Sequence, residues 1–331
     1  MSVVVTMLWV SMFCCMILLS INFGAGMYAY YGLKLNHTPS VTVLRYYLSP
    51  VWDVIDILFL GVVLYIADFL PLVMKDYGEP LLFPAVFVVI LLIGRAMIHL
   101  FWKKQLFSSR GLSLAYGLTG IICAVIMTAV LTISEGGYLF FSGGHMVLDV
   151  SVLLTSFYFW AVTLLAAISV FYISAIYLLF LSKKSGNERA AEKFRSYALV
   201  WSVPTLLSSA LIFIALERHN PEHFNRILDL SGYFLLSLVF YMLAVTYIFW
   251  KRYYGWAFFF VLCQYFFAFC GYGISHLPYL LYPYIKVHPF TTWQVGALSL
   301  LSALLLSILI PLFILRIRRV PVSRKSRHGE N

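Results

Sequence analysis

Charged residues are scarce in this chain of 331 residues. Asp, Glu, Lys and Arg together make up 11% of it, and 62% of the residues are hydrophobic. A soluble domain carries about 25% charged residues, so the composition excludes a soluble globular protein. The net charge of +10 then needs an explanation other than nucleic-acid binding, and no nucleic acid is expected as a partner.

Cysteine is also sparse, and its spacing is uninformative. No CxxC or Cys/His metal-binding spacing occurs, so the sequence predicts neither a disulfide framework nor a zinc finger. All five cysteines fall inside apolar runs: Cys14, Cys15, Cys123, Cys263 and Cys270.

Two further absences limit the architecture. The first ten residues contain no Lys or Arg, which argues against a cleaved signal peptide and favours a retained first helix. Long polar segments are missing as well, since the longest connections are 32–49, 134–151 and 182–195. We therefore expect the chain to act within the bilayer or through partners.

Apolar runs of about 20 residues, the length that spans a bilayer, recur along the whole chain. They predict an all-α integral membrane protein with nine transmembrane helices, forming two four-helix bundles plus one peripheral helix. The predicted spans are 4–31, 50–74, 81–102, 112–133, 152–181, 196–216, 229–250, 255–277 and 293–316.

The distribution of Lys and Arg predicts the orientation. If the amino terminus lies outside and nine helices follow, only Lys75, Arg218, Arg226 and Lys286 fall on the outer side. This bias follows the positive-inside rule and puts the carboxyl terminus in the cytoplasm. The inner basic residues are Lys34, Arg45, Lys103, Lys104, Arg110, Lys183, Lys184, Arg189, Lys193, Arg195, Lys251, Arg252, Arg316, Arg318, Arg319, Arg324, Lys325 and Arg327.

A weak internal repeat divides the single transmembrane domain, 1–331. The segments 99–104 and 248–252 both end a span with Phe-Trp followed by basic residues, which suggests a parallel duplication of 1–133 in 150–277. The extra helix 293–316 and the basic tail 317–331 would complete the domain. The alternative is ordinary interfacial anchoring by Trp and Lys.

Two carboxylates, Asp53 and Asp56, open the second predicted span. An acid in hydrocarbon costs roughly 2.5–3.5 kcal/mol, and Asp53 and Asp56 share one helix face. Such a coupled pair of acids at the predicted cytoplasmic end of a span suits proton uptake. For Asp53 a purely structural interpretation is also open, because Ser49 and Pro50 start the helix and its dipole favours a carboxylate there.

The third predicted span carries Arg95 and His99 at positions i and i+4 near the same inner end. Arg95 could form an ion pair with Asp53 or Asp56, or take part in proton movement, and His99 is the second expected charge partner of these acids. His99 lies too far from His276, near the outer end of the eighth span, for the two to ligate one heme. We therefore expect no heme bound by this chain.

One histidine pair, His219 and His223, lies in an outer loop, where Pro221 between them would interrupt a helix. No metal site is therefore predicted.

Several segments are similar to subunit II of cytochrome bd-type quinol oxidases. The run 49–53, Ser-Pro-Val-Trp-Asp, resembles the family's Gly-Pro-x-Trp-Asp, with Asp56 at its Glu or Gln position. The first-span segment 21–26 resembles the family's Gly-Phe-Asp-Phe-Gly-x-Gly, and Arg95 falls where the family has an arginine. The stretch 271–283 resembles its eighth span and the loop that follows. Trp52, Phe23, Gly24 and Gly26 are the family-motif residues expected to pack between helices.

The resemblance implies a heterodimer in the bacterial plasma membrane. Heme b and heme d groups and the quinol site would belong to the larger subunit I, while this chain would act as a scaffold and Asp53 would inherit a proton-conducting role. A bound quinone, membrane lipid and a small single-span subunit are further partners that the resemblance suggests. The chain departs from the family at Leu19 and Asn22, where the family has acidic residues, and at residues 54–55. These differences indicate a divergent branch.

Two alternatives remain open at this point. A proton-coupled secondary transporter would need helices broken near the midplane, for which Pro204, Gly117 and Gly120 are the candidates. An assembly subunit without proton conduction would fit the altered first-span motif.

Overall fold

The computed structural model describes residues 3–47, 71–106, 108–142, 145–277, 279–283 and 285–286. Trp52, Asp53 and Asp56 lie outside the described residues, as do the ninth predicted span and most of the second. The described helices are α1 Val3–Lys34, α2 Thr38–Tyr47, α4 Pro71–Leu106, α5 Arg110–Ser134, α6 Val150–Thr155, α7 Phe157–Lys184, α8 Glu188–His219, α9 Pro221–Asp229, α10 Ser231–Phe249 and α11 Tyr254–His276.

The described part of the chain contains six helices that are long and apolar enough to cross a membrane: α1, α5, α7, α8, α10 and α11. The long helix α4 adds a shorter apolar section, Pro84–His99. These findings confirm a multi-pass, helical membrane protein. The count of nine helices, their division into two bundles, and the internal repeat stay predictions.

Helix ends follow from local capping chemistry. The connection between α7 and α8 shows this, because Asn187 accepts a hydrogen bond from the backbone N–H of Ala190 and so caps α8. Gly186 takes a positive φ of 73° in the same turn, a conformation that glycine adopts without steric cost. A tight turn therefore brings α7 and α8 side by side.

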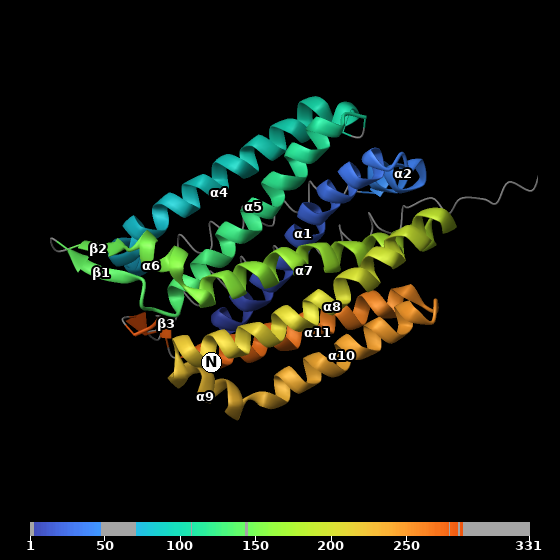
Figure 1. Cartoon of the computed structure of the whole chain (residues 1–331). Coiled ribbons are helices and arrows are strands. Elements are labelled where there is room, and N and C mark those ends of the chain that lie inside the picture. Colours follow the sequence, from blue (N-terminus) through green and yellow to red (C-terminus); the bar gives the residue numbers. More distant parts are fainter. Residues whose placement is uncertain are drawn as a thin grey trace, which may run out of the picture.

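The described long helices pack around α7 (Figure 1). The α4–α5 pair lies on one side of α1 and α7, and the α10–α11 pair lies on the other. One run of α7 side chains is almost completely buried: Tyr172, Ile173, Ala175, Ile176, Tyr177, Leu178 and Leu179. The bundle core therefore forms around α7.

Two short antiparallel ribbons were not expected from the all-α prediction. Strands β1 Leu139–Ser142 and β2 His145–Leu148 pair in the α5–α6 connection, and β3 Tyr279–Leu281 pairs with β4 Ile285–Lys286 after α11. They lie at the end of the bundle that also holds α6 and α9 (Figure 1). Each strand has at most four residues, too few to span a membrane, and we call this end the ribbon end.

Helices α5 and α8 are continuous through the residues considered as midplane breaks. Pro204 lies inside α8, and Gly117 and Gly120 lie inside α5. Both glycines are buried against α1, where an added Cβ on Gly117 would lie 2.8 Å from the backbone nitrogen of Met27. They permit close helix packing rather than a helix break.

Candidate functional site

Arg95 of α4 is buried, with 3% of its surface exposed. One of its terminal nitrogens donates to the side-chain oxygen of Asn22 on α1, at 3.1 Å. The other donates to the backbone carbonyl of Tyr116 and to the Thr119 hydroxyl at 3.3 Å, both on α5. The guanidinium thus binds three oxygen atoms and joins α4 to both neighbouring helices.

Aromatic faces complete the surroundings of this cation. The guanidinium carbon lies 3.8 Å from the ring centre of Tyr116 and 5.0 Å from that of Phe23, within the range of cation–π attraction. The Tyr116 hydroxyl donates to the same Asn22 oxygen at 3.0 Å. Among the described residues, every hydrogen-bond acceptor that Arg95 contacts is uncharged.

The glycines of the first-span motif lie where α1 approaches its neighbours most closely. A Cβ on Gly24 would lie 2.6 Å from the carbonyl oxygen of Val170 on α7, and one on Gly26 would lie 2.7 Å from the Tyr116 ring. Real Cβ contacts are longer than this, so only glycine fits. The segment 22–26 therefore binds Arg95 through Asn22 and packs against α7 and α5 through its glycines.

The structure brings only part of the predicted site together. Arg95, Asn22 and Phe23 meet, and His99 lies one turn further along α4, partly buried. Asp53 and Asp56 are outside the described residues, so the ion pair between Arg95 and either acid remains a prediction.

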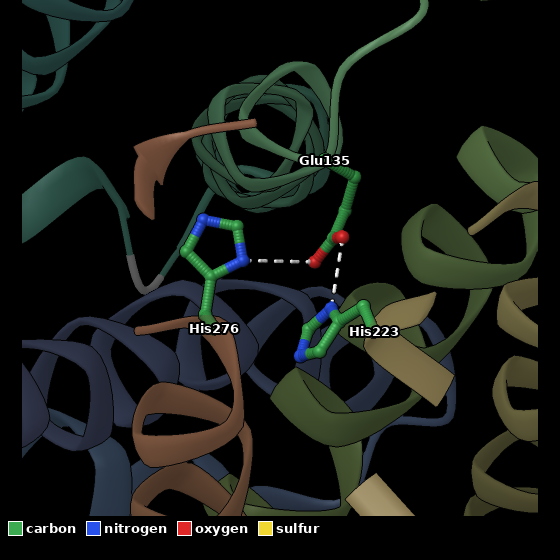
Figure 2. A group of neighbouring side chains, drawn as sticks. All are labelled: Glu135, His223 and His276. Carbon is green, nitrogen blue, oxygen red and sulfur yellow. Dashed lines mark hydrogen bonds and ion pairs between the residues drawn. The ribbon is translucent and has the colours of Figure 1, made fainter. Parts of the chain in front are cut away.

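A second cluster of polar side chains lies at the ribbon end, and we call it the Glu135 cluster. Glu135 is the buried residue that ends α5, and its carboxylate lies 2.9 Å from Nδ1 of His223 and 3.4 Å from Nδ1 of His276. Figure 2 shows both imidazoles directed at this carboxylate, one from α9 and one from the end of α11. The Tyr272 hydroxyl donates to Glu135 at 2.5 Å, and the Asn220 amide donates at 3.3 Å.

Local sequence places His223 in this cluster. Helix α8 ends at His219, Asn220 caps α9 by accepting from the backbone N–H of His223, and Pro221 starts α9. The predicted helix interruption is therefore present, and it sends the two histidines in different directions. His219 stacks between Tyr138 and Tyr158, with ring centres 5.1 Å from each.

Two opposing effects act on the pKa of the Glu135 carboxyl. Burial by itself raises this pKa. Hydrogen bonds and electrostatic attraction from His223 and His276 lower it by more, so the pKa lies well below its usual range. Glu135 is therefore an ionised acceptor at neutral pH.

Sequence reasoning missed the Glu135 cluster because its members share no motif. Glu135, His223 and His276 come from three different connections or helix ends. The available signal was topological, since the predicted spans put all three residues at the outer side of the membrane.

The family model of cytochrome bd terminal oxidase subunit II matches residues 1–320. The chain belongs to this family. A bd oxidase structure from Geobacillus thermodenitrificans is 35% identical, with a TM-score of 0.81 over 98% of this chain and 100% of that one. A curated Bacillus subtilis (strain 168) protein, assigned as a cytochrome bd menaquinol oxidase subunit II, is 23% identical over 293 residues, covering 86% of this chain and 84% of its own length.

Membership of the subunit II family gives the chain a place in a respiratory complex. It belongs to a membrane quinol oxidase, in which the partner, subunit I, carries the hemes. The resemblance identified from the sequence is thereby confirmed.

Asn22 offers a direct test of how this subunit II holds Arg95. Asn22→Leu is expected to destabilise the assembled complex by about 1–3 kcal/mol, because it removes the oxygen that Arg95 and Tyr116 share. Asn22→Asp keeps an oxygen acceptor and adds a charge-assisted bond, so its thermal stability should equal or exceed that of the wild type. Thermal release of heme from the purified complex measures both. Equal losses in the two variants would contradict this account of Arg95.

Proposed function

We propose that this subunit II scaffolds the heme-bearing subunit I and conducts protons from the cytoplasmic side toward the heme site. There, electrons from quinol reduce dioxygen to water. Asp53 and Asp56 are the proposed proton carriers, and Arg95 sets their charge balance. The subunit itself provides no catalytic site in this proposal. The amino terminus lies outside and the carboxyl terminus in the cytoplasm.

The observation that carries the proposal is the environment of Arg95. A buried cation is costly unless a charge partner or a set of hydrogen bonds compensates it. Among the described residues, Arg95 donates its hydrogen bonds to neutral acceptors only. A carboxylate from the second predicted span would supply the missing charge, and Asp53 and Asp56 are the acids that this span carries at the end where Arg95 lies.

The orientation is supported by the basic residues at helix ends. Lys34 ends α1, and Lys183 and Lys184 end α7, while Arg110 begins α5. All are at the end of the bundle opposite the ribbon end. By the positive-inside rule that end faces the cytoplasm, which puts the proposed proton entrance on the side from which respiratory protons are drawn.

The electron donor we propose is a quinol bound by the partner subunit. The Bacillus subtilis relative is assigned to a menaquinol oxidase, which makes menaquinol the first candidate. A secondary transporter is disfavoured because α5 and α8 run unbroken through Gly117, Gly120 and Pro204.

Asp53→Asn in the assembled oxidase tests the proton path. Loss of a positioned proton carrier should lower oxygen-consuming turnover about tenfold or more, and should lower charge movement across proteoliposomes in parallel. Asp149→Asn is the matched control, because Asp149 caps α6 at the ribbon end and should leave turnover unchanged. Heme content per complex reports assembly. Wild-type turnover and charge movement in Asp53→Asn would leave only the scaffolding role.

A further inference from the structure

We propose that the Glu135 cluster is a divalent-cation site, of the chemistry that Zn²⁺ prefers, at the ribbon end of the subunit. Glu135, His223 and His276 each offer one donor atom, and these atoms all lie within 4.8 Å of one another. Two imidazoles and a carboxylate form a recognised zinc ligand set. The proposal concerns a part of the molecule remote from Arg95 and is independent of the proton path.

Outside the ligand set, the Ser275 hydroxyl contacts the nitrogen of His223 that does not face Glu135. The Ser275 hydroxyl donates its one proton to the carbonyl of Tyr272, at 2.8 Å. A hydroxyl that donates to this carbonyl accepts from Nε2 of His223 in the tautomer that carries a proton there, and the two atoms lie 2.8 Å apart. In that tautomer the lone pair is on Nδ1, the nitrogen that lies 2.9 Å from Glu135, where it is available to a cation.

Without an ion, the other tautomer donates a hydrogen bond from Nδ1 to Glu135; with an ion, the lone pair of Nδ1 and the carboxylate oxygen both face the positive charge. Glu135 already accepts from Tyr272 and Asn220, which favours its ionised, acceptor-only form. An ionised carboxylate and an imidazole lone pair are both suitable ligands of one shared cation.

His276 favours the cation. Its Nδ1 lies 3.4 Å from the other oxygen of Glu135, which is long for a hydrogen bond. Zinc bonds of about 2.0–2.2 Å place two ligands of one ion roughly 3–4 Å apart, so this separation suits shared coordination. The other ring nitrogen of His276, Nε2, makes no hydrogen bond among the described residues, and one ion would engage all three side chains.

The surroundings support a preformed site. Glu135 and His223 are 2% and 0% exposed, and Tyr272 stacks on His276 with ring planes 13° apart. The Ser275 contact to the distal nitrogen of His223 is the kind of outer bond that orients metal-bound histidines. An ion here would join the ends of α5, α9 and α11, which come from both halves of the bundle.

Zinc content of the purified oxidase complex tests the proposal. After incubation with Zn²⁺ and desalting, the wild type should hold one more zinc per complex than His223→Gln or His276→Gln, by mass spectrometry of zinc against heme iron. His219→Gln is the matched control, since His219 lies at the same end but outside the ligand set, and it should keep the full zinc content. Equal zinc in the wild type and both ligand variants would overturn the site.

X-ray absorption of the zinc-loaded wild type gives a second measurement that needs no variant. The expected first shell contains two imidazole nitrogens and carboxylate oxygen at about 2.0–2.2 Å. A zinc shell without imidazole scattering would refute the assignment.

Discussion

Glu135→Ala is expected to destabilise the subunit by about 3–5 kcal/mol, because each buried donor left without its acceptor costs about 1–3 kcal/mol. The Tyr272 hydroxyl, the Asn220 amide and Nδ1 of His223 all lose the acceptor they share. Since α5, α9 and α11 meet at this carboxylate, the loss should loosen the whole ribbon end.

Thermal unfolding of the purified complex, followed by intrinsic fluorescence, measures this effect. Glu222→Ala is the matched control, because Glu222 lies at the same end with its side chain 60% exposed and contacts Arg226 at 3.2 Å. An exposed pair of this kind contributes up to about 1 kcal/mol. Similar losses in the two variants would show that Glu135 does not stabilise the ribbon end as described.

Gly24→Ala is the second substitution with a large expected effect. An added Cβ would collide with the Ser174 hydroxyl and would lie 2.6 Å from the backbone carbonyl of Val170. Overpacking against side chains typically costs about 1–3 kcal/mol, and here a backbone atom must also move. We expect α1 to shift away from α7 and the yield of assembled, heme-containing complex to fall severalfold.

Gly94→Ala separates this collision from the general effect of adding a methyl group to a helix. Gly94 lies in α4, where a Cβ would meet nothing within 4 Å among the described residues. Alanine is favoured over glycine in a helix by about 1 kcal/mol, so the complex should be as stable as the wild type or more so. Heme absorbance per milligram of purified complex compares the two. A wild-type yield for Gly24→Ala would contradict the close α1–α7 approach.

The sequence by itself determined that the protein is a helical membrane protein, and it carried enough motifs to indicate the family. The length of each apolar run and the placement of Lys and Arg are local properties of the chain. For that reason the spans that the structure describes fall close to their predicted positions. The segment 22–26 could be recognised as a motif for the same reason, since its five residues are adjacent.

Only the tertiary structure decided which side chains meet. Arg95 and Asn22 are 73 positions apart, and Glu135 and His223 are 88 apart. Such contacts depend on the order in which helices pack and on the rotation of each helix about its axis, which hydrophobicity does not specify when a helix is apolar on every face. The Glu135 cluster was therefore invisible in the spacing of its residues, and it exists because three helix ends converge at the ribbon end.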